Sequence, residues 1–266
     1  MSGRCAWALI AALLLAACWS GAGFCQDMEP VLPQGYEAMA GSLPVSEALQ
    51  LVLVVAGGWD DPEAVLYRFE RESLAGPWSQ VGEAVSCRAG ENGLAWGRGR
   101  HWRNPGWGPQ KMENDGRAPA GAFSLPRIFG RVAESRVMRL DAGMPYTELT
   151  AATVCVTDGS SGYYNEVVNP EALPFKDWDQ AVAMGESSGE SWGVMVDHNR
   201  FPPTPGNDAC VFLHGGDWGP GNATTLPDAA AKELALWLDY AAEPVLVQLG
   251  RAEYDMLAKA WGLPSI

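Results

Sequence analysis

Leu49-Gln50-Leu51-Val52-Leu53-Val54-Val55 is a continuous apolar and β-branched run, and Gly57-Gly58 ends it. A second run, Val65 to Glu70, follows after the turn-forming stretch Gly-Gly-Trp-Asp-Asp-Pro. Apolar runs of this length, bounded by glycine, proline and aspartate, are typical of β-strands. We therefore predict a β-hairpin here and treat it as the starting point of the fold.

The rest of the chain extends this β pattern and ends on a helix and a strand. From Pro227 to Tyr240 apolar residues recur at helical spacing, with Thr225 and Asp228 resembling a capping-box start. A last strand is predicted at Val245 to Leu249. We expect one mainly β domain over residues 46–266, a sandwich or barrel with a C-terminal helix. The other predicted strands are Val81–Val85, Phe123–Leu125, Thr153–Val156, Trp192–Val196 and Cys210–Leu213.

Composition excludes some partners. The 266 residues include 32 Asp and Glu against 18 Lys and Arg, a formal net charge of -14. Nucleic acids are bound mainly through Lys and Arg, so we expect no nucleic-acid partner. The same charge argues against holding an anionic membrane surface by electrostatics alone.

The N-terminus has the features of an export signal. Arg4 precedes an apolar stretch that ends in Leu15-Ala16-Ala17-Cys18. This pattern predicts a signal peptide over residues 1–17. The L-A-A-C ending resembles a bacterial lipobox, which implies lipidation of Cys18, a membrane anchor and a tether over residues 18–45. The alternative is ordinary cleavage within Ser20 to Cys25, which gives a soluble periplasmic protein.

The cysteines and histidines indicate a possible disulfide but show no metal-binding motif. Disulfides are allowed outside the cytoplasm, and Cys155 and Cys210 both lie in apolar β-like runs. They form either a bridge between strands or two buried thiols. Three scattered histidines without H-E-x-x-H or paired C-x-x-C spacing predict neither a metal site nor a cofactor.

Several motifs occur in a fixed order between Leu49 and Leu249. Together they resemble the periplasmic branch of the L,D-transpeptidase (YkuD) family. The motifs are K-M-E-N-D-G-R-A-P-A-G-A-F (Lys111 to Phe123), C-V-T-D-G-S-S-G-Y-Y-N (Cys155 to Asn165), W-G-V-M-V-D-H-N (Trp192 to Asn199) and C-V-F-L-H (Cys210 to His214).

The resemblance implies the YkuD-like catalytic-domain fold and cysteine acyl transfer on peptidoglycan stem peptides. In that chemistry a thiolate attacks a peptide carbonyl, and a neighbouring histidine activates the thiol. His214 matches the family's active-site histidine. His198 and Asn199 match its second histidine motif near the substrate groove, and Arg117 is expected to shape that groove.

The motif cysteine is missing. The family's T-A-G-C-T-A-M-P-like segment reads G-P-G-N-A-T-T-L-P here, Gly219 to Pro227, and Thr224 or Thr225 is the best-aligned position. A threonine hydroxyl needs strong base activation. Cys210, four residues before His214 in one strand, is expected to lie ~13 Å from it.

Three functions follow as hypotheses. The first is a catalytically degenerate YkuD-like envelope protein that binds peptidoglycan. The second is an active L,D-transpeptidase or carboxypeptidase with a non-standard nucleophile, so whether the chain is an enzyme stays open. The third is a structural envelope lipoprotein.

Overall fold

The hairpin that begins the fold is present in the structure, a computed structural model that describes residues 33–101, 105–138, 143–185, 189–216 and 219–266. β1 (Gln50–Ala56) pairs antiparallel with β2 (Glu63–Glu70), from Gln50 opposite Glu70 to Ala56 opposite Ala64. Every residue of β1 is buried, which explains its uninterrupted apolar sequence. The hairpin prediction is confirmed.

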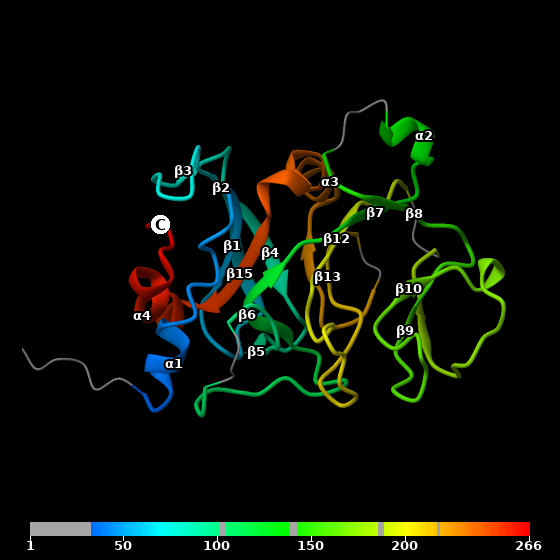
Figure 1. Ribbon diagram of the computed structural model, residues 1–266, viewed down its shortest axis with the longest axis horizontal. Helices are drawn as coiled ribbons and strands as arrows, with labels where there is room; N and C mark the ends of the chain where they lie inside the picture. Colours follow the sequence, from blue (N-terminus) through cyan, green and yellow to red (C-terminus); the bar gives the residue numbers. More distant parts are fainter. Residues whose placement is uncertain (1–32, 102–104, 139–142, 186–188, 217–218) are drawn as a thin grey trace, which may run out of the picture. The chain divides into compact units, whose positions relative to one another are not determined.

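β1 lies near the middle of a large mixed sheet that curls into a half-barrel (Figure 1). On one side of β1, β15 (Val245–Gly250) pairs parallel with it and antiparallel with β6. The mainly β fold class is confirmed. The strand order is β5 (Leu94–Trp96), β6 (Ala118–Ser124), β15, β1, β2, β4 (Val85–Ala89), β14 (Thr224–Leu226), β13 (Phe212–Gly215), β12 (Gly193–Met195), β7 (Ile128–Gly130) and β8 (Tyr146–Glu148), with β3 (Ser79–Gln80) beside β2.

A second, smaller sheet lies beside the far edge of the first (Figure 1). It consists of β10 (Val167–Val168), β9 (Val154–Val156) and β11 (Ala181–Ala183). Cys155 in β9 forms a disulfide with Cys210, just before β13. The bridge therefore joins the two sheets within an apolar cluster that includes Phe129 and Phe212.

The described helices are short and lie around the sheets. They are α1 (Tyr36–Ala40), α2 (Glu134–Val137), α3 (Asp228–Trp237) and α4 (Arg251–Trp261), with 3-10 turns η2 (Pro170–Ala172) and η3 (Tyr240–Ala242). The helix expected over Pro227 to Tyr240 is α3. The strand expected at the C-terminus is β15, but α4 follows it and was not predicted. The Trp261 indole donates to the Met39 carbonyl at 2.7 Å, which ties α4 to α1.

Two sequence predictions need correction, and a third concerns residues that the structure does not describe. α1 lies inside the range predicted as a tether, and Met39 is fully buried there. Residues 81–84 are not a strand; the predicted strand is shifted to β3 and β4. The signal peptide, the lipobox with Cys18 and the alternative cleavage site up to Cys25 lie outside the described residues. Within those residues, no helix is long and apolar enough to cross a membrane.

Candidate functional site

His214 lies in β13 between two neighbouring strands. It is fully buried, and its register partners are Gly193 in β12 and Thr225 in β14. Registered residues on adjacent strands present their side chains on the same face of a sheet. The sheet therefore brings together His214 and Thr225, which are eleven positions apart in the sequence.

The ring of His214 is held by backbone on two sides. Nδ1 lies 3.1 Å from the Gly215 carbonyl, so Nδ1 is the nitrogen that donates and carries the proton in the neutral ring. Burial lowers the pKa of His214, although the Gly215 carbonyl and Asp228 oppose this. A Cβ added to Gly219, whose φ is +100°, would lie 2.7 Å from Nε2. Gly219 thus packs directly against the edge of the imidazole.

The two candidate threonines point to opposite faces of β14. Thr224 Oγ1 donates to Gln248 Oε1 at 2.7 Å, and Gln248 in turn donates to the Pro119 carbonyl at 2.9 Å. The hydroxyl of Thr224 is therefore used in a buried hydrogen bond on the face of the sheet opposite to His214. Thr225 faces the histidine side and is half-buried. The expected capping role of Thr225 is wrong, because α3 begins after Pro227 and Thr225 is a strand residue.

No free thiol lies beside His214 among the described residues. Cys210, the other candidate nucleophile, is tied to Cys155 in the disulfide. Cys87 is the free cysteine of this part of the chain. It is buried in β4, and burial together with the nearby Glu63 carboxylate raises its pKa to about 12. The Cys87 thiol is therefore protonated at neutral pH and unsuited to nucleophilic attack.

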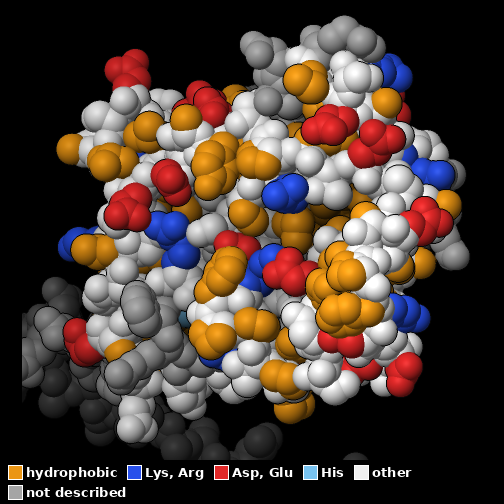
Figure 2. Space-filling model, turned by 45° about the vertical axis from the view of Figure 1, so that its right-hand side comes forward, with side chains coloured by type: hydrophobic (Ala, Val, Ile, Leu, Met, Phe, Trp, Pro, Cys, Tyr) orange, Lys and Arg blue, Asp and Glu red, His pale blue; other side chains and the backbone are white. Residues whose placement is uncertain are grey.

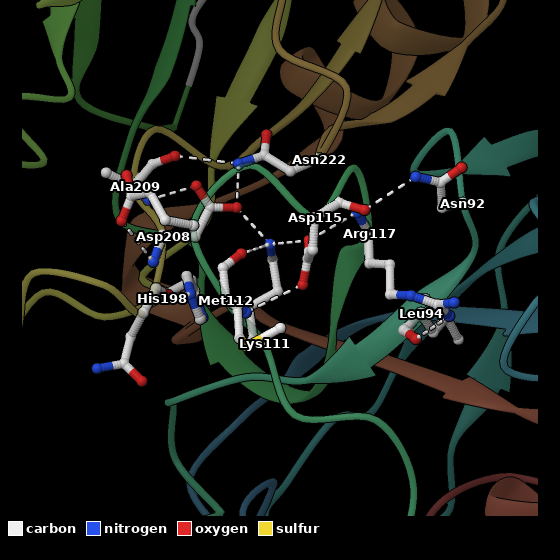
Figure 3. Close-up of polar contacts among 12 residues, drawn as sticks. Asn92, Leu94, Lys111, Met112, Asp115, Arg117, His198, Asp208, Ala209 and Asn222 are labelled. Carbon is white, nitrogen blue, oxygen red and sulfur yellow. Dashed lines mark hydrogen bonds and ion pairs between the residues drawn. The ribbon is translucent and has the colours of Figure 1, made fainter.

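A buried ionic network lies beneath the loop that leads to β14 (Figure 3). The ammonium of Lys111 donates to Asp115 at 2.5 Å and also to Asp208. Asn222 Nδ2 donates to the same Asp208 oxygen at 2.7 Å and to the Ala209 carbonyl at 3.1 Å. The Lys111 side chain is only 1% exposed and that of Asp208 7%. The network anchors Asn222, two residues before β14, to the segment that precedes β13.

Sequence reasoning did not identify this network. Lys111 and Asp115 stand inside the first family-like motif, but nothing in it names Asp208 or Asn222 as partners. A buried lysine almost always has a charged partner, so knowing that Lys111 is buried would have indicated a network. The loop sequence around Lys111 does not reveal that it is buried.

His198 has a structural role, because both of its ring nitrogens are used in hydrogen bonds within the fold. It is not the register partner of His214. Its Nδ1 accepts the Arg98 backbone N–H at 3.2 Å, and its Nε2 donates to the Asn207 carbonyl at 2.8 Å. Burial lowers its pKa to about 4, so the ring is neutral at pH 7. Both ring nitrogens are engaged, which leaves His198 no capacity for a ligand.

Asn199 and Arg117 are likewise used within the fold. The Asn199 amide donates to the carbonyls of Thr204 and Asp208, both at 2.9 Å. The Arg117 guanidinium donates to the Trp59 carbonyl at 2.8 Å and to Asp60 at 2.6 Å. These contacts fix loops around β5 and β12. The structure thus brings one predicted pair together, His214 with Thr225, and holds the others apart from it.

No cluster of three or more potential metal ligands occurs among the described residues. Comparisons of the chain with protein-family models, with curated proteins and with solved structures give no match.

Proposed function

We propose that this chain is an L,D-transpeptidase (YkuD)-like protein of the cell envelope that binds peptidoglycan stem peptides without transferring acyl groups. The observation that supports it best is the pairing of His214 in β13 with Thr225 in β14, which belongs to the segment where the resemblance implies a thiol. The histidine is retained and a hydroxyl stands beside it. YkuD-like fold, peptidoglycan as partner and an exported, lipid-anchored location belong to the same proposal.

The absent thiol also follows from the motif itself. When the family's T-A-G-C-T-A-M-P-like segment is aligned on its closing proline with Pro227, the cysteine position falls on Ala223. Ala223 lies in the bend just before β14 and is buried. An alanine methyl group there offers no nucleophile. Ala223, Thr224 and Thr225 are thus the positions of this segment that correspond to the missing cysteine, depending on how the shorter segment is aligned.

A second candidate function is acyl transfer by Thr225. The register that places its side chain on the His214 face favours it over Thr224, whose hydroxyl is bonded to Gln248. A threonine hydroxyl is far less acidic than a thiol and depends on a base close to its oxygen. His214 is the candidate base on the same face of the sheet, so the Thr225 and His214 pair is the testable form of this alternative.

Intact-mass spectrometry separates the two functions. The full-length chain is incubated with a carbapenem and, separately, with tetrapeptide muropeptides. We expect no covalent adduct on the wild-type chain and an adduct on Ala223→Cys, which places a thiol at the motif position. An adduct on the wild-type chain that disappears in both Thr225→Val and His214→Ala would replace our proposal with the enzyme.

Co-sedimentation with purified sacculi tests the binding half of the proposal. We expect the wild-type chain to be retained and to be released by soluble muropeptides. Absence of retention would leave a structural envelope protein as the better description.

A further inference from the structure

Gly97-Arg98-Gly99-Arg100 follows β5 as a bent segment that lies beside β6. Gly97 N–H donates to the Ala120 carbonyl at 2.9 Å, and Arg100 N–H donates to the Ala122 carbonyl at 2.7 Å. Both glycines face the sheet, whereas Arg98 is exposed and Arg100 is half-buried.

The inward face has no room for side chains. A Cβ on Gly97 would lie 2.6 Å from the Pro119 side chain, and a Cβ on Gly99 would lie 2.2 Å from the Ala122 carbonyl oxygen. Glycine is therefore required at both positions for this segment to approach the sheet. The two glycines of the G-R-G-R sequence therefore allow the segment to lie against β6 with Arg98 and Arg100 lining the groove beside it.

These arginines line an open groove of about 950 Å³. One wall is the segment after α1, which contributes Leu43 and Glu47, and the opposite wall contributes Arg200 and Phe201. Leu43 and Phe201 are large apolar side chains that are 56% and 82% exposed. Figure 2 shows that acidic, basic and hydrophobic side chains are interspersed on one face of the molecule, around a hollowed region.

Two of the three groove arginines are already paired with carboxylates. Arg200 pairs with Glu166 at 2.8 Å and with Asp197 at 3.2 Å, and Arg100 pairs with Glu47 at 3.4 Å. Arg98 is exposed, and its described side-chain contact is a 3.2 Å hydrogen bond from Nη1 to the Asn199 amide oxygen. Arg98 lines the groove, and no described carboxylate is in ion-pair contact with it.

We propose that this groove binds a peptide-sized ligand that carries a carboxylate and an apolar side chain. Arg98 receives the carboxylate, because a guanidinium presents paired N–H donors that match the two carboxylate oxygens. Leu43 and Phe201 contact the apolar part. The unmatched cation gives the groove a local preference for anions in a chain whose net charge is -14. This inference does not depend on the function proposed above.

The groove is separate from the His214 site. His214 is registered with Gly193 at one end of β12, whereas Asp197 and the groove residues follow the other end of that strand. The four residue steps of extended chain from Gly193 to Asp197 span roughly 13 Å. Ligand binding in the groove can therefore be measured without involving the histidine.

Isothermal titration of the full-length chain with N-acetyl-Phe-Glu tests the proposal, with the uncharged N-acetyl-Phe-Gln amide as the matched ligand. We expect Arg98→Gln to weaken binding of the acidic peptide about tenfold, which is the loss of one charge-assisted contact. Arg98→Lys should lie between the two, because it keeps the charge and loses the paired donors. Arg127→Gln is the matched control, since Arg127 also donates to a neutral side chain, at 3.0 Å, but lies outside the groove.

Amide chemical shifts locate the binding and report whether each variant is folded. The proposal is supported if the ligand shifts the amide signals of residues 97–100 and 199–201 in the wild-type chain. At least one of the variants Arg98→Gln and Arg98→Lys must also give a native spectrum. The proposal is overturned if the acidic peptide does not bind, if Arg98 variants bind it as well as the wild-type chain, or if the uncharged peptide binds equally. Equal affinity for inorganic phosphate would also overturn it, because the groove would then be a general anion site.

Discussion

Replacement of Lys111 by methionine should destabilise the protein more than any surface charge change. The Lys111 side chain is 1% exposed and touches Asp115 and Asp208, whose side chains are 12% and 7% exposed. Methionine keeps the length and apolar stem of lysine but removes the cation, which leaves two carboxylates facing one another away from water. Breaking a buried ion pair by removing one partner costs about 3–5 kcal/mol. For a domain of this size that corresponds to a fall in Tm of roughly 6–20 °C.

Lys232→Met is the matched control. Lys232 also makes an ion pair, at 2.7 Å with Glu190, but its side chain is 40% exposed. Exposed pairs contribute under about 1 kcal/mol. Urea unfolding under non-reducing conditions, followed by tryptophan fluorescence, gives the free energy of unfolding for both variants. A loss for Lys111→Met that is no larger than the loss for Lys232→Met would refute the reasoning.

A charge-balanced variant distinguishes lost charge pairing from lost packing. Adding Asp208→Asn to Lys111→Met removes one of the two stranded carboxylates, so part of the lost stability should return. If the double variant is less stable than Lys111→Met alone, the hydrogen bonds from Asn222 and Ala209 to Asp208 contribute more than its charge costs.

Three further outcomes follow from the same contacts. Reduction of the Cys155–Cys210 disulfide, which spans 55 positions, should lower the free energy of unfolding by about 4 kcal/mol, and a urea series with and without reductant measures this. Because burial lowers the pKa of His198 from 6.5 to about 4, its contribution to stability is complete above pH 6.5 and decreases as pH falls towards 4, by ~3 kcal/mol in all. His198→Gln should flatten that slope in urea midpoints between these pH values, and an unchanged slope would exclude this residue as its source. Gly219→Ala should cost about 1–2 kcal/mol because of its positive φ and the imidazole edge beside it, whereas Gly106→Ala, with open space around it, should be neutral in the same assay.

The sequence predicted elements whose signal is local. The β1–β2 hairpin, β15 and α3 each combine a clear apolar period with turn residues at their ends. Helix α4 also has a local signal, since Tyr254, Leu257 and Trp261 are buried at helical spacing, but no element was predicted after the strand that ends at Leu249.

Errors arose where distant segments decide the local structure. Thr225 has the residue type of a helix cap, but pairing with β13 and β4 holds it in a strand. Lys111 and Asp208 are 97 positions apart, and only the folded sheet brings them into contact. Neither the pairing register nor the partner of a buried charge can be read from one short motif.

The two proposed sites differ in their exposure to solvent. His214 is fully buried in the described geometry, with Gly219 against its ring, whereas the Arg98 groove is open and lined by exposed donors and apolar groups. Retention on sacculi that survives His214→Ala and decreases in Arg98→Gln would assign wall binding to the groove. The reverse result would assign it to the histidine site and would require that site to open on binding. The same pair of variants therefore decides whether wall binding, where it is observed, depends on the His214 site or on the separate Arg98 groove.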